Sequence, residues 1–507
     1  MPAKPLNLPL ITFGTVLATF MQALDATIAN VALPHMQGGF SASYDQISWV
    51  LTSYIVAAAI MTPPTGWLSN RFGRKKLFLV SIAGFVIASV LCGLATSIYE
   101  MVAFRVLQGM AGAALVPLSQ SVLLDSYPKE RHGSAMAVWG MGAVVGPVLG
   151  PTLGGWLTDH YTWRWVFYIN VPFGILAFLV ISAAVAETKI DKGLRFDALG
   201  FGLISLAIAS LQMFLDRGEQ LDWFGSTEIV VEAVLAALAF YLFVVHAFTT
   251  KEPFISPKLF RDRNFSVSLI FISVVGVILF ATMALLPPML QGLMGYPVFS
   301  AGLLLAPRGI GTIFAMVFVG HLLQRVDARY LLVFGLAVSS YSFWWMSSFA
   351  LALPQWDVAV SGLIQGFGLG FVWVPLTTIA YSTLLPEDRN EAAGVFNLMR
   401  NIGSSVGISS VVALLAQNTQ RLHSALAANI NATNPILQDP AVHRFWNPST
   451  TEGIAALNAE VTRQASMIAY IDDFKLMMIM ALALIPLVLL FSAPPRATVG
   501  AAAMAME

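Results

Sequence analysis

The chain has 507 residues, of which 57% are hydrophobic and 11% are charged, and its formal net charge is zero. This composition is too apolar for a soluble globular protein and is typical of a chain that lies mostly in a membrane. The net charge gives no reason to expect nucleic acid as a partner. Cys92 is the only cysteine, so no intramolecular disulfide can form.

The first apolar stretch, residues 8–33, contains one carboxylate, Asp25, in an otherwise charge-free run from Pro5 to Pro34. The stretch continues beyond Asp25 and lacks the small-residue cleavage site of a signal peptide, so we expect it to remain as a membrane helix. An aspartate near the middle of such a helix costs about 2.5–3.5 kcal/mol on insertion scales and usually marks an ion or proton path. Asp25 is therefore the first candidate functional residue.

Fourteen apolar stretches are long enough to cross a bilayer, which takes about 20 residues of helix. The eighth contains Glu232 and His246, although residues 233–250 hold no Asp, Glu, Lys or Arg. The sequence therefore predicts an all-α integral membrane protein. The expected spans are 8–33, 47–69, 77–98, 101–124, 133–157, 165–186, 198–215, 229–249, 265–289, 299–323, 330–353, 357–384, 391–417 and 474–492.

The distribution of Lys and Arg indicates the orientation of these spans. If the N-terminus is cytoplasmic, the connecting segments on that side and the two tails hold 18 of the 27 Lys and Arg residues. The short loops on the other side hold only Arg164 and Arg217. This is a strong positive-inside bias. We therefore expect both termini in the cytoplasm and the long segment 418–470 outside.

Short motifs recur in the two ends of the chain. The pattern Gly-x-Leu-x-x-Arg at 66–71 returns at 320–325, and two further motifs return in the same order at offsets of 257 to 258 residues. Internal repeats are a common construction of secondary transporters, with the substrate path between the repeats. We expect two pseudo-symmetric six-helix bundles with two inserted helices. The expected domains are 1–187, the inserted pair with its linkers at 188–263, and 264–507, which includes the external loop 418–470.

Helical spacing places Gln22, Asp25 and Ala29 on one face of the first span, and Arg105 and Gln108 on one face of the fourth. An arginine stays protonated, so Asp25 is the better candidate for a group that binds and releases a proton. Arg105 is then its electrostatic tuner or a polar anchor. The alternative is a permanent Asp25–Arg105 pair that only locks helices together.

The fifth span combines a stripe of glycines with prolines that weaken its hydrogen-bond ladder. Such a helix can pack closely and bend, which suits a gating role, but the same stripe also fits packing alone. Its residues are Gly142, Gly146, Pro147, Gly150 and Gly154.

Polar residues in several spans are expected to line a central substrate cavity, because exposure to lipid would be too costly. The two arginines among them could attract anionic substrates or pair with backbone carbonyls. The candidates are Gln22, Gln108, Arg308, Asn397, Arg400 and Asn401.

Several motifs resemble those of the major facilitator superfamily, in particular its fourteen-span branch of drug:proton antiporters. Residues 24–34 resemble the first-helix motif, residues 105–109 a motif implicated in proton transfer, and the glycine stripe the span 5 motif of antiporters. Residues 66–75 resemble the signature of the loop between spans 2 and 3, although Asn70 stands where an acid is usual. The other gating positions that this signature implies are Gly66, Arg71, Gly73 and Arg74.

Residues 215–224 narrow the resemblance to EmrB-type inner-membrane subunits of tripartite multidrug pumps. The resemblance implies the major facilitator fold and export of lipophilic drug-like molecules by alternating access, driven by a proton gradient without a cofactor or metal. It also implies a bacterial inner membrane, a periplasmic adaptor protein and an outer-membrane channel. We expect the adaptor to dock on 418–470, unless this segment is a plain solvated hairpin.

Other functions fit the sequence less well. The seven His residues are scattered, and neither metal-ligand spacing nor a phosphate-binding Gly-x-x-x-x-Gly-Lys loop occurs, which argues against an enzyme or an ATP-driven pump. Residues 403–407 match a hydrolase elbow but lie within an expected helix. The remaining rivals are an uptake symporter of the same superfamily and a single-component exporter of a specific metabolite.

Overall fold

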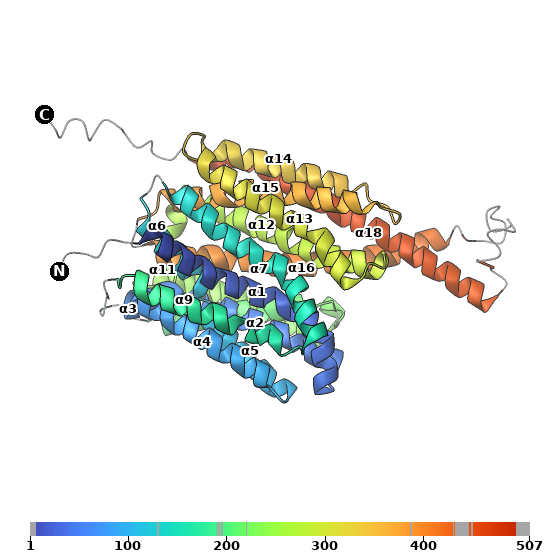
Figure 1. The fold of residues 1–507 in the computed structure, drawn as a ribbon, viewed down its shortest axis with the longest axis horizontal. Coiled ribbons are helices and arrows are strands. Elements are labelled where there is room, and N and C mark those ends of the chain that lie inside the picture. The colour runs from blue at the N-terminus through green and yellow to red at the C-terminus, as the bar shows by residue number, and fades with distance from the viewer. Residues whose placement is uncertain are drawn as a thin grey trace.

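In the computed structural model the chain is a bundle of long helices that run roughly along one direction (Figure 1). No β-strand occurs in the residues that the structure describes. These residues are 7–128, 131–188, 190, 193, 196–219, 221–385, 388–428, 430, 446–447 and 450–492.

Most elements are α-helices, with a few short 3₁₀ and π segments between them. The α-helices are α1 (Leu8–Phe40), α2 (Tyr44–Met61), α3 (Thr65–Phe72), α4 (Arg74–Leu94), α5 (Ile98–Gly112), α6 (Leu115–Ser126), α7 (His132–His160), α8 (Trp165–Tyr168), α9 (Asn170–Ala184), α10 (Ala198–Arg217), α11 (Thr227–Thr249), α12 (Arg263–Pro288), α13 (Val298–Leu322), α14 (Ala328–Met346), α15 (Gln355–Ser382), α16 (Arg389–Ala427) and α18 (Thr451–Leu487). The short segments are η2 (Trp223–Gly225), η3 (Leu259–Arg261), η4 (Met289–Leu293) and η7 (Val488–Leu490).

The described residues contain twelve helical segments that are long and apolar enough to cross a membrane. The pair α2 and α3, bent by 56°, counts as a thirteenth if it is one span. α14 coincides with the eleventh expected span but is not among them, because its mean hydropathy is too low. Arg329 near its start lowers this mean, together with several Ser, Tyr and Trp residues. The expectation of an all-helical membrane protein is confirmed, whereas the count of fourteen spans is not.

Prolines break two of the expected spans. Pro117 follows the turn at Ala113 that separates α5 from α6, and a proline ring crowds the carbonyl four residues earlier. Pro63 lies in the bend between α2 and α3. α7 instead runs unbroken through Pro147 and Pro151.

Side chains cap several helix ends, because the first backbone N–H groups of a helix lack partners within it. Ser43 and Gln46 form a capping box at the start of α2. Asp197 caps α10 by accepting from the N–H of Gly200 at 2.9 Å, and it also accepts from Phe254 and His246. Burial raises the pKa of Asp197, but these hydrogen bonds and the nearby His246 hold it below its usual value.

The helices pack as two groups. In an N-terminal group, α1 lies against α7 and α9, and α5 lies against α2 and α4. In a C-terminal group, α13 and α14 pack against α15, and α12 and α18 pack against α16. The two groups meet where α7 lies along α13 and where α3 and α6 contact α16. α10 and α11 pack on each other, and α10 also contacts α2 and α16.

The bundle has two distinct ends. We call the end where α1 begins and α18 ends the terminus side, and the opposite end the hairpin side. On the hairpin side α16 continues to Ala427 and α18 begins at Thr451, and α18 projects beyond the bundle at the right of Figure 1. Much of the expected loop 418–470 is therefore helical. Residues 429, 431–445, 448 and 449 of that loop lie outside the described residues.

Candidate functional site

Asp25 lies fully buried in α1 and is paired with Arg105 of α5. Arg105 Nη1 donates to Asp25 Oδ2 at 2.8 Å, and neither side chain is more than 1% exposed. Arg105 Nε donates to the carbonyl of Val50 at 3.0 Å, and the guanidinium carbon lies 4.1 Å from the centre of the Tyr54 ring. The ion pair that we considered from helical spacing is present, and α2 holds its arginine in place.

Two amides complete the surroundings of the Asp25 carboxylate. Gln108 Nε2 and Asn170 Nδ2 each donate to Asp25 Oδ1 at 2.8 Å. Both amides also donate to Ser89 Oγ, at 3.2 and 2.9 Å, and Ser89 in turn donates to the carbonyl of Phe167. The carboxylate accepts three short hydrogen bonds and has no exposed surface in this conformation. This network joins α1, α4, α5 and α9.

The glycine stripe of α7 packs against the segment of α1 that carries Asp25. A Cβ atom on Gly146 would lie 2.7 Å from the backbone nitrogen of Leu24, and one on Gly154 would lie 2.9 Å from Ile28 Cγ1. Gly142 and Gly150 approach α1 in the same way. The stripe therefore holds two helices of one group together, and the opposite face of α7 meets α13.

The loop between α3 and α4 turns at Gly73, whose φ of 94° favours glycine. The backbone N–H groups of residues 75 and 76 donate to the Glu187 carboxylate at 3.0 and 3.1 Å. A carboxylate from the segment after α9 thus satisfies the N-terminus of α4. The other expected gating residues of this region lie on α3: Gly66, Asn70 and Arg71.

Arg74 joins a charge cluster between the two helix groups. Its Nη1 lies 2.7 Å from Asp125 Oδ2, and Arg389 Nη1 lies 3.1 Å from Asp125 Oδ1. Asp125 is near the end of α6 and Arg389 begins α16, so one carboxylate links the groups. Asn397 of α16 adds a second link by donating to Gln120 Oε1 of α6 at 2.8 Å. The groups are therefore in contact on the terminus side.

The two arginines among the expected cavity residues, Arg308 and Arg400, lie in the C-terminal group and have no ion-pair partner among the described residues. Arg308 Nη2 donates to the carbonyl of Leu279 at 3.1 Å. Arg400 Nη2 donates to Asn401 Oδ1 at 3.1 Å, and its guanidinium carbon lies 5.8 Å from the centre of the Trp373 ring. Both positive charges are thus satisfied only by neutral acceptors.

Two further donors accompany Arg400. Trp373 Nε1 and the hydroxyl of Tyr381, both on α15, are buried and have no hydrogen-bond partner in the described part of the chain. Tyr381 interacts electrostatically with Arg400, and Trp373 lies 3.7 Å from the Cβ position of Gly140 on α7. We call Arg400, Trp373 and Tyr381 the donor cluster. Such a set can hold a ligand that supplies acceptor atoms.

The structure places the six expected cavity residues in different surroundings. Gln108 binds Asp25 within the buried network, and Gln22 donates to the Tyr54 hydroxyl at 3.5 Å. Asn397 links α16 to α6 rather than facing open space. The remaining three lie in the C-terminal group: Arg308, Arg400 and Asn401.

Sequence reasoning did not identify Ser89, Asn170 or Asp125. Asn170 is the only amide in the sixth expected span, so a polar residue in an apolar run was a usable signal, as it was for Asp25. Ser89 and Asp125 carry no such signal, because serines are common in membrane helices and Asp125 lies close to the end of an expected span.

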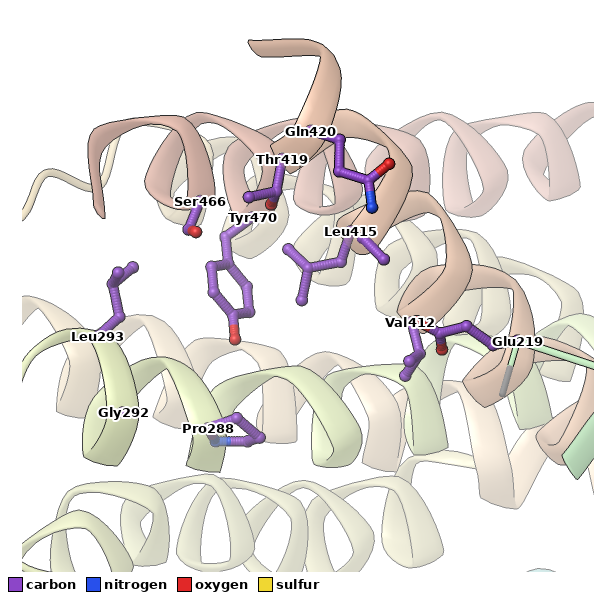
Figure 2. A pocket seen from close by; sticks show the side chains of 11 residues that line it. Glu219, Pro288, Gly292, Leu293, Val412, Leu415, Thr419, Gln420, Ser466 and Tyr470 are labelled. Atoms are coloured by element: carbon purple, nitrogen blue, oxygen red, sulfur yellow. The ribbon is translucent and has the colours of Figure 1, made fainter. Parts of the chain in front are cut away.

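A pocket of about 540 Å³ opens on the hairpin side between α12, α16 and α18 (Figure 2). In Figure 2 Tyr470 points into it from α18, Leu415 lies beside it on α16, and Pro288 lies at the edge formed by α12. Glu219, which follows α10, lies at one end. None of the predicted site residues lines this pocket. No group of three or more His, Cys, Asp or Glu that could hold a metal occurs in the described residues.

Residues 15–408 match the family model of the Major Facilitator Superfamily. The chain is 38% identical to the multidrug export protein EmrB of Haemophilus influenzae over 96% of both chains. It is 36% identical to the fatty acid resistance protein FarB of Neisseria gonorrhoeae over 97% of this chain and 98% of that one.

Among solved structures, the human organic anion transporter MFSD10 matches with a TM-score of 0.59 and 14% sequence identity, over 94% of this chain and 100% of that one. At this identity the match supports the fold alone. The family match covers most of the chain and agrees with the two packed helix groups. The chain therefore belongs to the Major Facilitator Superfamily.

Proposed function

We propose that this chain is a proton-coupled multidrug exporter that works by alternating access. The observation that carries the proposal is the buried network around Asp25, because an ionisable group inside a membrane protein is a functional site by default. Its similarity to EmrB proteins, which are multidrug export proteins, supports export of drug-like molecules. The chain is then a transporter rather than an enzyme.

In the proposed cycle Asp25 takes up a proton when its site opens to one side and releases it when the site opens to the other. In this conformation Asp25 is fully buried, so a helix movement is needed for proton access. Protonation cancels the charge that Arg105, Gln108 and Asn170 contact, and this changes the relative stability of the two conformations. Proton and drug are coupled by their different affinities for each state.

The energy comes from a proton gradient, and the cycle needs no cofactor. One charge that moves through 100 mV contributes about 2.3 kcal/mol. This corresponds to a concentration ratio of roughly fiftyfold for the exported molecule. One proton per exported molecule is therefore enough to maintain a substantial concentration gradient of the drug.

We place the terminus side in the cytoplasm of a bacterial inner membrane, on the basis of the Lys and Arg distribution. The projecting ends of α16 and α18 then lie in the periplasm, where His423 and Asn458 are hydrogen-bonded at 3.0 Å. We propose these ends as the dock for a periplasmic adaptor, which would pass substrate to an outer-membrane channel.

An uptake symporter and an exporter of one specific metabolite remain the alternatives. The resemblance of FarB, a fatty acid resistance protein, to this chain fits an exporter with a narrower range of lipophilic substrates. Transport measured in both directions, with several unrelated drugs, separates these three functions.

The test uses purified protein in proteoliposomes with an imposed pH gradient. Wild-type protein should drive drug against its gradient, and Asp25→Asn should fold and still bind drug but lose proton-driven transport. Asp472→Asn is the matched control, because Asp472 is an exposed carboxylate paired with Lys475. If Asp25→Asn transports drug at the wild-type rate, proton coupling depends on a residue other than Asp25.

A further inference from the structure

The inserted helix α10 touches both helix groups near its end on the hairpin side. Towards the C-terminal group, Ser405 of α16 donates to Gln212 Oε1 at 2.7 Å, and Ser409 donates to the carbonyl of Leu215 at 2.6 Å. Ser405 and Ser409 are one turn apart, so one face of α16 carries both contacts. Two hydroxyl hydrogen bonds therefore hold α10 to the C-terminal group.

Towards the N-terminal group, α10 makes contacts that involve charged side chains. Asp216 accepts hydrogen bonds from Gln212 Nε2 at 3.1 Å and from the side chain of Thr52 on α2. The guanidinium carbon of Arg217 lies 5.9 Å from the centre of the Trp49 ring, also on α2. A continuous polar chain thus runs from Thr52 through Asp216 and Gln212 to the serine at 405, and it bridges the two groups.

The residues after α10 fix its end to α11. Arg217 forms an ion pair with Glu228 of α11, and the ring centres of Phe214 and Trp223 are 5.4 Å apart. Asp222 has a left-handed φ of 59°, which turns the chain back over the helix. The described residues of 218–224, part of the segment that the sequence set apart, therefore form a compact turn that supports the end of α10.

We propose that α10 is a gate helix of the transport cycle. On the hairpin side it closes the boundary between α2 and α16, which we call the seam, and it separates from α16 when that side opens. The proposal rests on export by alternating access, in which the two groups must part on each side in turn. It assigns a role in transport to Gln212, Ser405 and Ser409.

The two sets of contacts indicate whether α10 separates from α2 or from α16. Hydrogen bonds to a carboxylate are stronger than those between neutral groups, and α10 contacts α2 through a carboxylate and a guanidinium. Its bonds to α16 join neutral partners, and such bonds between membrane helices are weak. α10 should therefore stay with α2, and the two serine contacts should break.

The seam also leads to the pocket of Figure 2. Val412 and Ala416 line that pocket and continue the face of α16 that carries the two serines, and Glu219 of the turn after α10 lies at its end. Separation of α10 from α16 would widen the pocket along this face. A lipophilic molecule that leaves the seam would then enter a space whose lining includes the apolar side chains of Val412, Leu415 and Pro288.

The test is reversible cross-linking in proteoliposomes with a short bifunctional methanethiosulfonate reagent. In the Gln212→Cys/Ser405→Cys variant, cross-linking should abolish drug export and reduction should restore it. The matched control is Thr52→Cys/Asp216→Cys, whose cross-link joins α10 to the group with which it moves. Cross-linking should leave the export rate of that variant at its own starting value. The native Cys92 is buried. Variants that carry only one of the two introduced cysteines show whether the reagent affects export by reacting at another site.

Continued export after cross-linking of residues 212 and 405 would overturn the proposal that α10 is a gate helix. Equal arrest of both variants would also overturn it, because α10 would then not move with α2. A second variant, Ser405→Ala/Ser409→Ala, needs no cross-link and should increase drug leak through the protein without a pH gradient. An unchanged leak contradicts the proposal. If the uncross-linked parents and the wild type all fail to export, the proposed function fails instead.

Discussion

At the scale of single residues, the Asp25–Arg105 pair shows how this chain keeps two charges inside a membrane. Burying an ion pair costs several kcal/mol unless further hydrogen bonds satisfy both partners. Asp25 has donors from Arg105, Gln108 and Asn170, and Arg105 also has the carbonyl of Val50. Asp25→Asn keeps the shape of the side chain and one acceptor oxygen, and it replaces the second oxygen with a donor NH2 group. It therefore removes the charge with less change of packing than an apolar substitution.

The donor cluster gives a prediction about substrate charge. Arg400→Gln removes the only charge of the cluster, and a charge-assisted hydrogen bond is worth about 1.5–3 kcal/mol, so the apparent KM for an anionic drug should rise roughly tenfold or more. The apparent KM for a cationic drug should not rise. Export by inverted vesicles with one dye of each charge measures the difference. Arg421→Gln, an exposed position on the same helix, is the control. Equal losses for both dyes would show that Arg400 does not select by charge.

At the scale of elements, α7 and α1 pack closely along their length within the N-terminal group. Glycines on α7 allow α1 to approach until a Cβ atom would clash with its backbone, and Asp25 stands next to one such contact at Leu24. α5 and α9 supply Asp25 with its hydrogen-bond partners, and Ser89 of α4 accepts from the two amides among them. The glycine stripe thus fixes the position of the carboxylate as well as the packing of the helix.

The stripe predicts a difference between two glycines of α7. A Cβ atom at Gly146 would lie 2.7 Å from Leu24 N, whereas one at Gly155 would meet nothing closer than 3.9 Å, at Val31. Gly146→Ala should therefore reach the membrane but lose most of its export, because α1 must shift beside Asp25. Gly155→Ala should match the wild type. Drug resistance of cells that express each variant at equal levels checks this, and normal resistance from Gly146→Ala would mean that α1 position is not critical.

At the scale of the whole molecule, the contacts between the two groups differ at the two ends. On the terminus side the groups share the carboxylate of Asp125 and the hydrogen bond between Asn397 and Gln120. On the hairpin side α10 stands between α2 and α16 as well. Each set must break in turn if the protein works by alternating access.

The terminus-side contact can be weakened without leaving a charge unpaired. Arg389→Gln removes one partner of Asp125 and leaves Arg74 in place. A partly exposed ion pair is worth up to about 1 kcal/mol, so the population open on the terminus side should increase several-fold. Labelling of a cysteine placed at Asn397 by a maleimide measures this opening. Lys475→Gln, which removes an exposed ion pair, should have no effect, and equal labelling rates in the two variants would contradict the role of Arg389.

The projecting ends of α16 and α18 give a separate prediction. Replacement of residues 424–465 with a short flexible linker should leave drug binding in detergent intact, because the predicted substrate and proton residues lie elsewhere. It should weaken association with the adaptor, measured by co-purification. Unchanged co-purification would show that the adaptor docks on another surface.

The sequence by itself determined the membrane class, the helical fold and the candidate proton site, since a charge in an apolar run and a glycine every fourth residue are local patterns with few physical explanations. It could not determine what surrounds those residues. Asn170 of α9 donates to Asp25, and Ser89 of α4 accepts from the amides of Gln108 and Asn170. Asp125 joins Arg74 to Arg389, and Gln212 meets Ser405 across 193 positions of the chain. These contacts depend on how helices far apart in sequence pack, and spacing within one helix carries no information about its neighbours.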